Sequence, residues 1–176
     1  VGGPHFLKIT DEDSNYSGRV FLITNNQRNS VILEMSRLAN GEPTTVSSYF
    51  PVGTKCEIIP APTLGSTFGM SLSDLPANWT TGLPEGTDWI YLWNSDSWGY
   101  QPYFFLDSSY EGSGFGQGWY SQTNPGQGLK NNMVLYPDEA FIMAKRSPNP
   151  VTFELDGMVN TSAQKLYLPG SGNQAL

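Results

Sequence analysis

The residues best suited to recognising a ligand are aromatic, and they cluster: residues 89–120 hold twelve of the chain's twenty-three Phe, Tyr and Trp side chains. Flat aromatic faces with polar rims bind sugar rings and protein partners. The structural alternative is a cross-strand aromatic core, and Trp89, Tyr91 and Trp93 share one face under period-two alternation. We expect most of the cluster, including Trp93, to be core.

A glycine-rich loop at residues 107–118 lies inside this cluster. Its spacing does not fit a phosphate-binding Gly-x-Gly-x-x-Gly, and no Gly-Lys-Ser/Thr follows it. Exposed aromatic side chains beside a mobile loop need a partner or become an aggregation risk. We therefore expect Tyr110, Phe115 and Trp119 to be exposed. Together with Tyr120, they are the predicted contacts to a ligand or partner.

Carboxylates in the same segment are candidates for glycoside hydrolysis, which uses a pair of Asp or Glu side chains around the scissile bond. The candidates are Asp96, Asp107 and Glu111, although solvated turn carboxylates are the simpler interpretation. Residues 11–15 (Asp-Glu-Asp-Ser-Asn) imitate the first half of a calcium loop. Because Tyr16 replaces the loop's glycine and its bidentate Glu is missing, a turn is the simpler interpretation there as well.

The patterns typical of nucleophilic catalysis are missing. His5, the single histidine, lies near the start of the chain, where a base is poorly oriented. No serine lies in Gly-x-Ser-x-Gly. Cys56, the single cysteine, alternates with Ile58 and is expected to be a small buried hydrophobe rather than a reactive thiol. We expect no catalytic residue, no metal and no cofactor, and hence a protein that is not an enzyme.

Composition limits the classes of protein to which the chain can belong. Nine Lys plus Arg stand against sixteen Asp plus Glu, a net charge of −7, which disfavours nucleic acid as a partner. With 38% hydrophobic and 13% aromatic residues the 176-residue chain can bury a core. One cysteine permits no internal disulfide, and no apolar run approaches a membrane span. Without a signal peptide before Val1, the composition favours a mature, exported chain that is extracellular or at the cell surface.

Period-two alternation dominates the chain and predicts an all-β fold, a sandwich or barrel of about nine or ten short strands, or two small packed β lobes. Strands are expected near 19–24, 31–35, 55–60, 88–93, 98–106, 119–120, 133–136, 141–144, 151–155 and 166–168, with at most one helical turn at 63–68. The polar segment up to Pro84 is interpreted as a connection. We therefore divide the chain into an N-terminal lobe, 1–82, and an aromatic-rich C-terminal lobe, 83–176.

The N-terminal segment is also capable of β-structure. Leu7 and Ile9 share one face under period-two alternation, and Phe6 and Lys8 share the other. Such a segment either forms the first strand of its own sheet or adds as a strand to the sheet edge of a neighbouring subunit. The first is the simpler interpretation, and the second makes Phe6, Leu7 and Ile9 a candidate assembly strand.

Several motifs in order carry a family resemblance. Gly18-Arg19 opens the first hairpin, Glu57-Ile58-Ile59-Pro60-Ala61-x-Thr63-Leu64 follows, and Pro137-Asp138-Glu139 comes late in the chain. With the Asp88-to-Asn94 segment, these motifs resemble a family of secreted, paralogous, uncharacterised β-proteins of Verrucomicrobia-type bacteria. The resemblance covers nearly the whole chain. It implies an exported protein without known catalytic residues, and it assigns no activity.

Two functions of different class follow. The leading hypothesis is a non-enzymatic structural or adhesive protein of the cell surface, with self-assembly into a filament, sheath or layer as one form of that role. Only 14% of residues are charged, and charge is a main device by which β-proteins keep their edges apart. The alternative is a carbohydrate-binding module that uses aromatics of residues 89–120, and a glycosidase is the weakest of the three. Expected partners are copies of the chain, other surface proteins or a polysaccharide.

Overall fold

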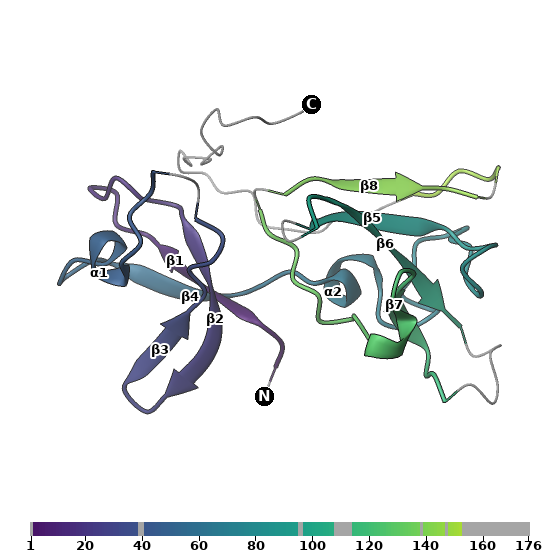
Figure 1. Cartoon of the computed structure of the whole chain (residues 1–176), viewed down its shortest axis with the longest axis horizontal. Helices are drawn as coiled ribbons and strands as arrows, with labels where there is room; N and C mark the ends of the chain where they lie inside the picture. The colour runs from purple at the N-terminus through teal and green to yellow at the C-terminus, as the bar shows by residue number, and fades with distance from the viewer. Residues whose placement is uncertain are drawn as a thin grey trace. The chain divides into compact units, whose positions relative to one another are not determined.

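The computed structural model describes residues 2–38, 41–94, 97–107, 114–137, 139–146 and 148–152. The chain forms two compact units that meet in sequence between Ala61 and Pro62. Each unit contains one four-stranded antiparallel sheet, and the described helices are each no longer than five residues (Figure 1). The all-β prediction, in its two-lobe form, is confirmed.

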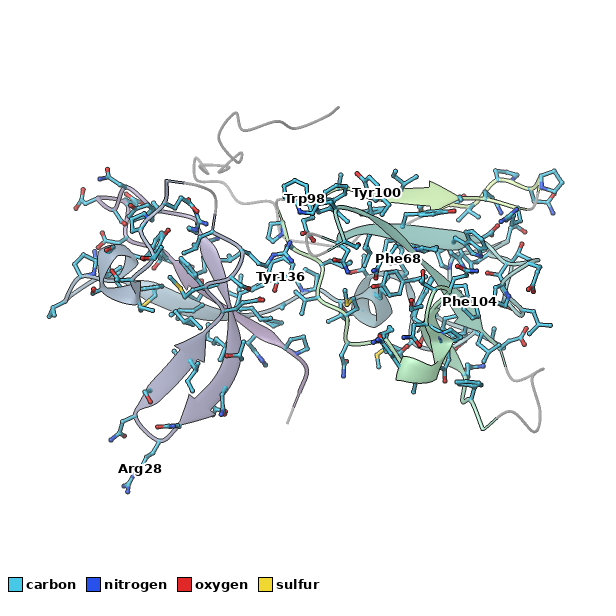
Figure 2. The ribbon with its side chains drawn as sticks, viewed as in Figure 1. Arg28, Phe68, Trp98, Tyr100, Phe104 and Tyr136 are labelled. Atoms are coloured by element: carbon cyan, nitrogen blue, oxygen red, sulfur yellow. The ribbon has the colours of Figure 1, made fainter. Side chains whose placement is uncertain are left out.

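The sheet of the first unit has the strand order β3-β2-β1-β4. β1 (His5–Ile9) lies inside the sheet and pairs with both β2 (Val20–Gln27) and β4 (Cys56–Pro60). β2 and β3 (Ser30–Leu33) form the predicted hairpin, whose turn carries Arg28 (Figure 2). The predicted strand at 55–60 also ends as expected at Pro60, which has no N–H to donate to a ladder.

The core of the first unit lies over β1 and β2. Ile9 and Phe21 are buried there with Tyr49 of the short helix α1 (Val46–Tyr49). The guanidinium of Arg19 lies 5.5 Å from the ring centroid of Phe21 and 5.4 Å from that of Tyr49, and it forms a bidentate ion pair with Glu42. The cation therefore closes one side of the aromatic core while its charge is neutralised.

The prediction that Cys56 is buried is wrong. Cys56 is exposed, and so is Ile58, which shares its face of the strand. β4 is the edge of its sheet, whereas the side chains that cover this face pack over β1 and β2. Alternation correctly places Cys56 and Ile58 on one face of the strand. It does not tell how far the covering side chains extend across the sheet.

The sheet of the second unit has the order β7-β6-β5-β8. β5 (Trp89–Asn94) is inside the sheet, as its apolar sequence on both faces predicts. It pairs with β6 (Gly99–Leu106) and with β8 (Phe141–Ala144), and β6 also pairs with β7 (Gly118–Ser121). The 3-10 turn η1 (Pro125–Gln127) follows β7.

One face of this second sheet carries the unit's core. Its buried side chains are Ile90, Leu92, Tyr103, Phe105 and Trp119. The predicted helical turn, α2 (Leu64–Phe68), packs Leu64 and Phe68 against them. Thr63 begins this helix with a reciprocal capping box to Ser66, which satisfies amide groups that a short helix leaves free.

The unit boundary lies earlier than the predicted division at residue 82. Leu64, Phe68, Leu75 and Trp79 all pack in the core of the second unit, so the predicted connection belongs to that unit. The strand expected at 133–136 is reduced to one bridge between Val134 and Thr63. Of the strand expected at 151–155 only its first two residues are described, without regular structure, and 166–168 lies outside the described residues.

Within the described part of the chain, no helix has the length and apolar character needed to cross a membrane.

Candidate functional site

The face of the second sheet opposite the core carries a row of aromatic side chains. The register pairs Trp89 with Phe104, Tyr91 with Pro102, and Trp93 with Tyr100. Because opposite residues in a ladder share a face, these side chains line up on two neighbouring strands. β7 adds Tyr120 and β8 adds Ile142 to the same face. We call this side of the sheet the aromatic face, formed by Trp89, Tyr91, Trp93, Tyr100, Pro102, Phe104, Leu106, Tyr120 and Ile142.

One end of the aromatic face is closed. Phe104, Leu106 and Tyr120 are buried there and form a second apolar cluster. Phe115 packs edge-on against Tyr120 with ring centroids 5.4 Å apart, and the Tyr120 hydroxyl donates to the carbonyl of Gly116 at 2.9 Å. The segment around Phe115 therefore covers this end of the face.

The other end is open. Trp93 is half-buried and packs edge-on against Tyr100 with centroids 5.3 Å apart, while Tyr100 and Ile142 are exposed. Trp98, two residues before Tyr100, stands in the turn between β5 and β6 (Figure 2). We call Trp93, Trp98, Tyr100 and Ile142 the open end. It presents large apolar side chains from three strands, β6, β5 and β8, and from one turn, and hydrogen-bonded ladders join the three strands.

Trp98 is unfavourable for stability in two ways. Its φ angle is +49°, in the left-handed region, which costs a side-chain-bearing residue about 1–2 kcal/mol. Its side chain is 80% exposed, so burial does not offset that cost. Strained residues of this kind concentrate at functional sites. Recognition of a ligand is the role that such a side chain is suited to.

Trp98 was not singled out from the sequence. Its signal is a large aromatic residue that follows the polar turn segment Asn94–Ser97 and directly precedes Gly99. Asn, Asp and Gly are the residues that normally take the left-handed conformation in such turns. Once the hairpin is recognised, the sequence alone therefore shows that a tryptophan stands where Asn, Asp or Gly is usual.

The middle of the aromatic face is held in place by its neighbours. The guanidinium of Arg146 lies 4.6 Å from the ring centroid of Trp89. The Trp89 indole N–H donates to the carbonyl of Pro84 at 2.9 Å, and its ring lies 5.8 Å from that of Tyr91. These contacts fix the ring planes before any ligand arrives, which lowers the entropy cost of binding.

Asp88, immediately before β5, is the buried charge of the site. Its carboxylate accepts hydrogen bonds from the amide of Arg146 at 2.6 Å, the amide of Thr80 at 2.8 Å and the ammonium of Lys145 at 3.2 Å. Burial opposes ionisation of Asp88, but these hydrogen bonds and the Lys145 charge outweigh it, so the pKa lies below its ordinary value. The carboxylate thereby positions Arg146 beside Trp89.

The predicted contact residues fall in different environments. Phe115 is 38% exposed, as expected, whereas Tyr110 lies outside the described residues. The expected exposure of Trp119 is wrong, because Trp119 is fully buried, and Tyr120 is buried as well. Three of these four residues are described, and only Phe115 is accessible on the surface.

Trp119 is buried because alternation along β7 turns it towards the core. It is paired with Phe105, whose ring lies 5.5 Å away, and it contacts Phe68 and Trp79 at 6.1 and 5.9 Å between centroids. Its indole N–H donates to the carbonyl of Gly69 at 2.8 Å. Proximity to the glycine-rich loop was therefore a poor guide to exposure.

The candidate assembly strand lies inside a sheet. Phe6 and Ile9 are buried and Leu7 is half-buried. β1 is paired along both of its sides within the first unit, through β2 and β4. The segment therefore forms the first strand of its own sheet, which is the simpler of the two interpretations.

The candidate carboxylates are not brought together in the described residues. Asp107 accepts a hydrogen bond from the hydroxyl of Thr81 at 2.9 Å, and Asp96 and Glu111 lie outside the described part. Residues 11–15 form turns, with the Asp13 amide donating to the Asp11 carboxylate at 3.3 Å. Over the described ranges, no three His, Cys, Asp or Glu side chains are grouped to hold a metal ion.

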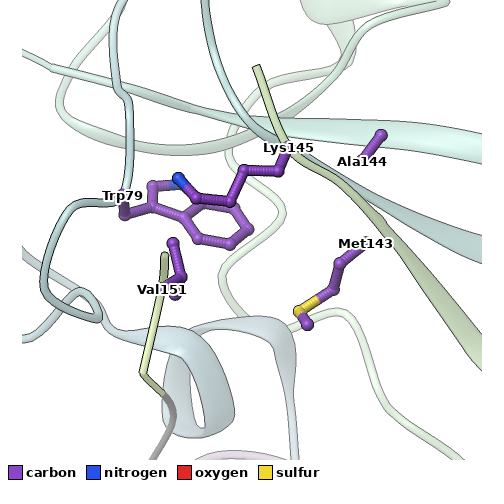
Figure 3. A pocket seen from close by; sticks show the side chains of 5 residues that line it. All are labelled: Trp79, Met143, Ala144, Lys145 and Val151. Atoms are coloured by element: carbon purple, nitrogen blue, oxygen red, sulfur yellow. The ribbon is translucent and has the colours of Figure 1, made fainter. Parts of the chain in front are cut away.

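A small cavity lies on the core side of β8. Its volume is about 160 Å³, and it is lined by Trp79, Met143, Ala144, Lys145 and Val151 (Figure 3). The Lys145 ammonium is bound by the Asp88 carboxylate and by the carbonyl of Asn78 at 3.0 Å. The cavity therefore lies between Trp79 and the C-terminal end of β8.

Comparisons of this chain with protein-family models, with curated proteins and with solved structures found no match.

Proposed function

We propose that this chain is a non-enzymatic adhesive protein of the cell exterior, which binds polysaccharide at the open end of its aromatic face. The observation that carries the proposal is Trp98, a strained and exposed tryptophan in the turn two residues before Tyr100, whose ring packs on Trp93. An exposed aromatic group of this kind, on a rigid sheet, offers flat apolar surface to the C–H faces of sugar rings.

The chemistry of the open end favours a neutral sugar chain. Its four side chains carry no charge, so nothing in it selects for an acidic ligand. The adjacent turn supplies polar groups for sugar hydroxyls, since Asn94 and Ser97 lie there and the Ser97 amide donates to the Asn94 side chain at 3.1 Å. Few polar groups around an apolar platform are typical of small-molecule and glycan sites.

The test is a pull-down of the purified chain with insoluble cellulose, chitin and xylan. We expect at least one of these polymers to retain the protein. Trp98→Ala and Tyr100→Ala should each lower that affinity by about tenfold, since buried aromatic contacts contribute about 1.4 kcal/mol or more to recognition. Leu72→Ala is the matched control, because Leu72 is exposed in the same unit but lies outside the aromatic face.

Retention by none of the polymers, or equal retention of Trp98→Ala, Tyr100→Ala and Leu72→Ala, would contradict the proposed site. The exterior location rests on the low fraction of charged residues, 14%, in a chain rich in Gly, Asn, Ser and Thr. It is tested separately, by protease accessibility of the protein on intact cells. Full protection of the protein against added protease would contradict it.

A further inference from the structure

β8 is an edge strand with unusual chemistry. In the part of the chain that the structure describes, β8 pairs with β5 alone, so its other side offers backbone groups for pairing (Figure 1). Its sequence, Phe-Ile-Met-Ala, has no charged or polar side chain. Phe141, Ile142 and Met143 are each between 42% and 48% exposed. Natural edge strands avoid this combination, because it is a template for pairing with another chain.

The opposite edge of the same sheet is protected. All four residues of β7 are buried, and its outer side is already bonded. The amide of Lys130 donates to the carbonyl of Trp119 at 2.7 Å, and the amide of Trp119 donates to the side chain of Asn131 at 2.9 Å. The contrast identifies β8 as the edge that the described residues of this unit leave open.

We propose that two copies of this chain associate edge to edge through β8, antiparallel, with a two-fold axis at Ile142. For the two sheets to be continuous, residues opposite each other must lie on the same face, so their numbers differ by an even number. Centring the pair on Ile142 places Ile142 opposite its own copy. It also places Phe141 opposite Met143 of the second copy, twice by symmetry, so all three exposed apolar side chains gain a neighbour.

The charges around the strand support a second copy as the occupant. Glu139 precedes β8, and Lys145 and Arg146 follow it. In the register centred on Ile142, Glu139 lies opposite Lys145 of the second copy at both ends of the pair. The Lys145 ammonium binds Asp88 and the Asn78 carbonyl in its own copy, and its third N–H is the donor for Glu139. Each copy carries a net charge of −7, so association is favoured where charges are absent or of opposite sign. β8 with its flanks meets both conditions.

A shift of the axis by one residue is less favourable. Centring the pair on Met143 would place Phe141 opposite Lys145 of the second copy and Ile142 opposite Ala144. That register leaves Phe141 without an apolar neighbour in the second copy and removes the pairing of opposite charges. The charged residues that flank β8 and its apolar side chains therefore favour the same register.

The first test measures the oligomeric state of the wild-type chain by light scattering coupled to size-exclusion chromatography. We expect a concentration-dependent dimer that Ile142→Lys converts to a monomer, because the two new charges would face each other. Ile32→Lys is the matched control, since Ile32 is an exposed apolar residue of the edge strand β3. It should leave the dimer unchanged, and circular dichroism should show both variants folded.

The second test reads the register directly. Cys56 is exposed, so it is first replaced with Ser. In that background Ile142→Cys should form a dimer disulfide under mild oxidation, because residues directly opposite in an antiparallel pair have Cβ atoms about 4.5–5.5 Å apart. Ile32→Cys should not form one at the same protein concentration.

A wild-type chain that stays monomeric at about 1 mM would overturn the proposal. So would a dimer that persists unchanged in Ile142→Lys, because the interface would then lie elsewhere. A monomer whose β8 amides are nevertheless protected from hydrogen exchange on both sides would show that another part of the same chain occupies the edge, and it would overturn the proposal too. Polysaccharide binding is not required for any of these outcomes, so the two proposals fail independently.

Discussion

The two faces of the second sheet are built from similar residues but differ in what covers them. The core face holds Trp119, which is fully buried between Phe68 and Phe105, and the aromatic face holds Trp93, which is half-buried beside Tyr100. From alternation and the neighbouring glycine-rich loop we expect the opposite, with Trp93 in the core and Trp119 exposed. Aromatic content therefore does not distinguish a core from a surface in this sheet.

The difference comes from segments far away in the sequence. α2 and Trp79, before the sheet, cover the core face together with Met133 and Leu135, after β7. On the aromatic face the cover that the described residues provide reaches only the closed end, where Phe115 packs on Tyr120. Alternation states which side chains share a face, but the location of the cover depends on long-range packing.

The largest effect is expected for Trp119→Ala. Removing this fully buried ring should lower the free energy of unfolding by about 3–5 kcal/mol, the usual cost of truncating a core aromatic. Urea unfolding followed by circular dichroism measures it. Trp119→Phe, which keeps a ring but loses the hydrogen bond to Gly69, should cost clearly less. A loss below about 1 kcal/mol for Trp119→Ala would break the contrast between the faces.

A second, smaller effect concerns Asp88, which joins the aromatic face to the core. Asp88→Asn leaves its amide donors with a weaker acceptor and should cost about 1–3 kcal/mol. Because the pKa of Asp88 is lowered in the folded state, its carboxylate stabilises the fold above the unfolded pKa of about 3.9, and this is lost as the pH falls through the folded pKa.

Thermal melts between pH 7 and pH 2.5 test this dependence. The wild-type chain should lose stability progressively below a pH of about 4, and Asp88→Asn should show a shallower decline. Asp74→Asn is a suitable comparison, because Asp74 is an exposed carboxylate whose pKa is also lowered, through its hydrogen bonds from Ser71 and Ser73. Parallel pH curves for the wild-type chain and Asp88→Asn would show that Asp88 does not contribute.

Trp93→Ala should have a moderate effect on stability, about 1–2 kcal/mol, because the ring is only half-buried. Its effect on polysaccharide binding should be large, since Trp93 supports Tyr100 at the open end. Measuring unfolding and pull-down on the same preparations separates the two. Equal stability losses for Trp93→Ala and Trp119→Ala would remove the distinction between the faces.

The smallest effect, and one of opposite sign, is expected for Trp98→Gly. Glycine adopts a positive φ without strain, so the free energy of unfolding should rise by up to about 1 kcal/mol while affinity at the open end falls about tenfold. A melting temperature that rises as affinity falls is the signature of a residue kept for function. A marked loss of stability would instead assign Trp98 a structural role.

Local structure was predictable where local sequence decides it. The hairpin of β2 and β3, the inner strand β5 and the helical turn before Gly69 all follow from alternation, turn residues and capping chemistry. The exposure of Cys56 and the unit boundary after Ala61 could not be predicted in this way, because both depend on which segments pack over a sheet. Edge position and cover are properties of the assembled fold rather than of a window of residues.

The candidate site was predicted only as a region. Residues 89–120 contain three of its four side chains, those of Trp93, Trp98 and Tyr100, and Phe115 is exposed as expected. The open end was missed, because Trp98 and Tyr100 look like ordinary hairpin residues until the φ angle of one and the face of the other are known. Ile142, which completes the open end, lies far away in the sequence and joins the face only through the pairing of β5 with β8.

The Asp88 carboxylate also determines how the second unit responds to a pulling force. It binds the amide of Arg146, just beyond the Ala144 end of β8, and the amide of Thr80 on the other side. Tension applied to the chain after Pro150 first loads the hydrogen bond from the Asn78 side chain to the Pro150 carbonyl and then this carboxylate, before it reaches the ladder between β8 and β5. An antiparallel strand pulled from one end separates bond by bond, so the attachment at Arg146, next to the strand, sets the force at which the peeling of β8 begins. In the proposed adhesive role, Asp88 would be the contact that resists the peeling of β8 from the sheet, and protonation of its carboxylate at acidic pH would weaken that contact.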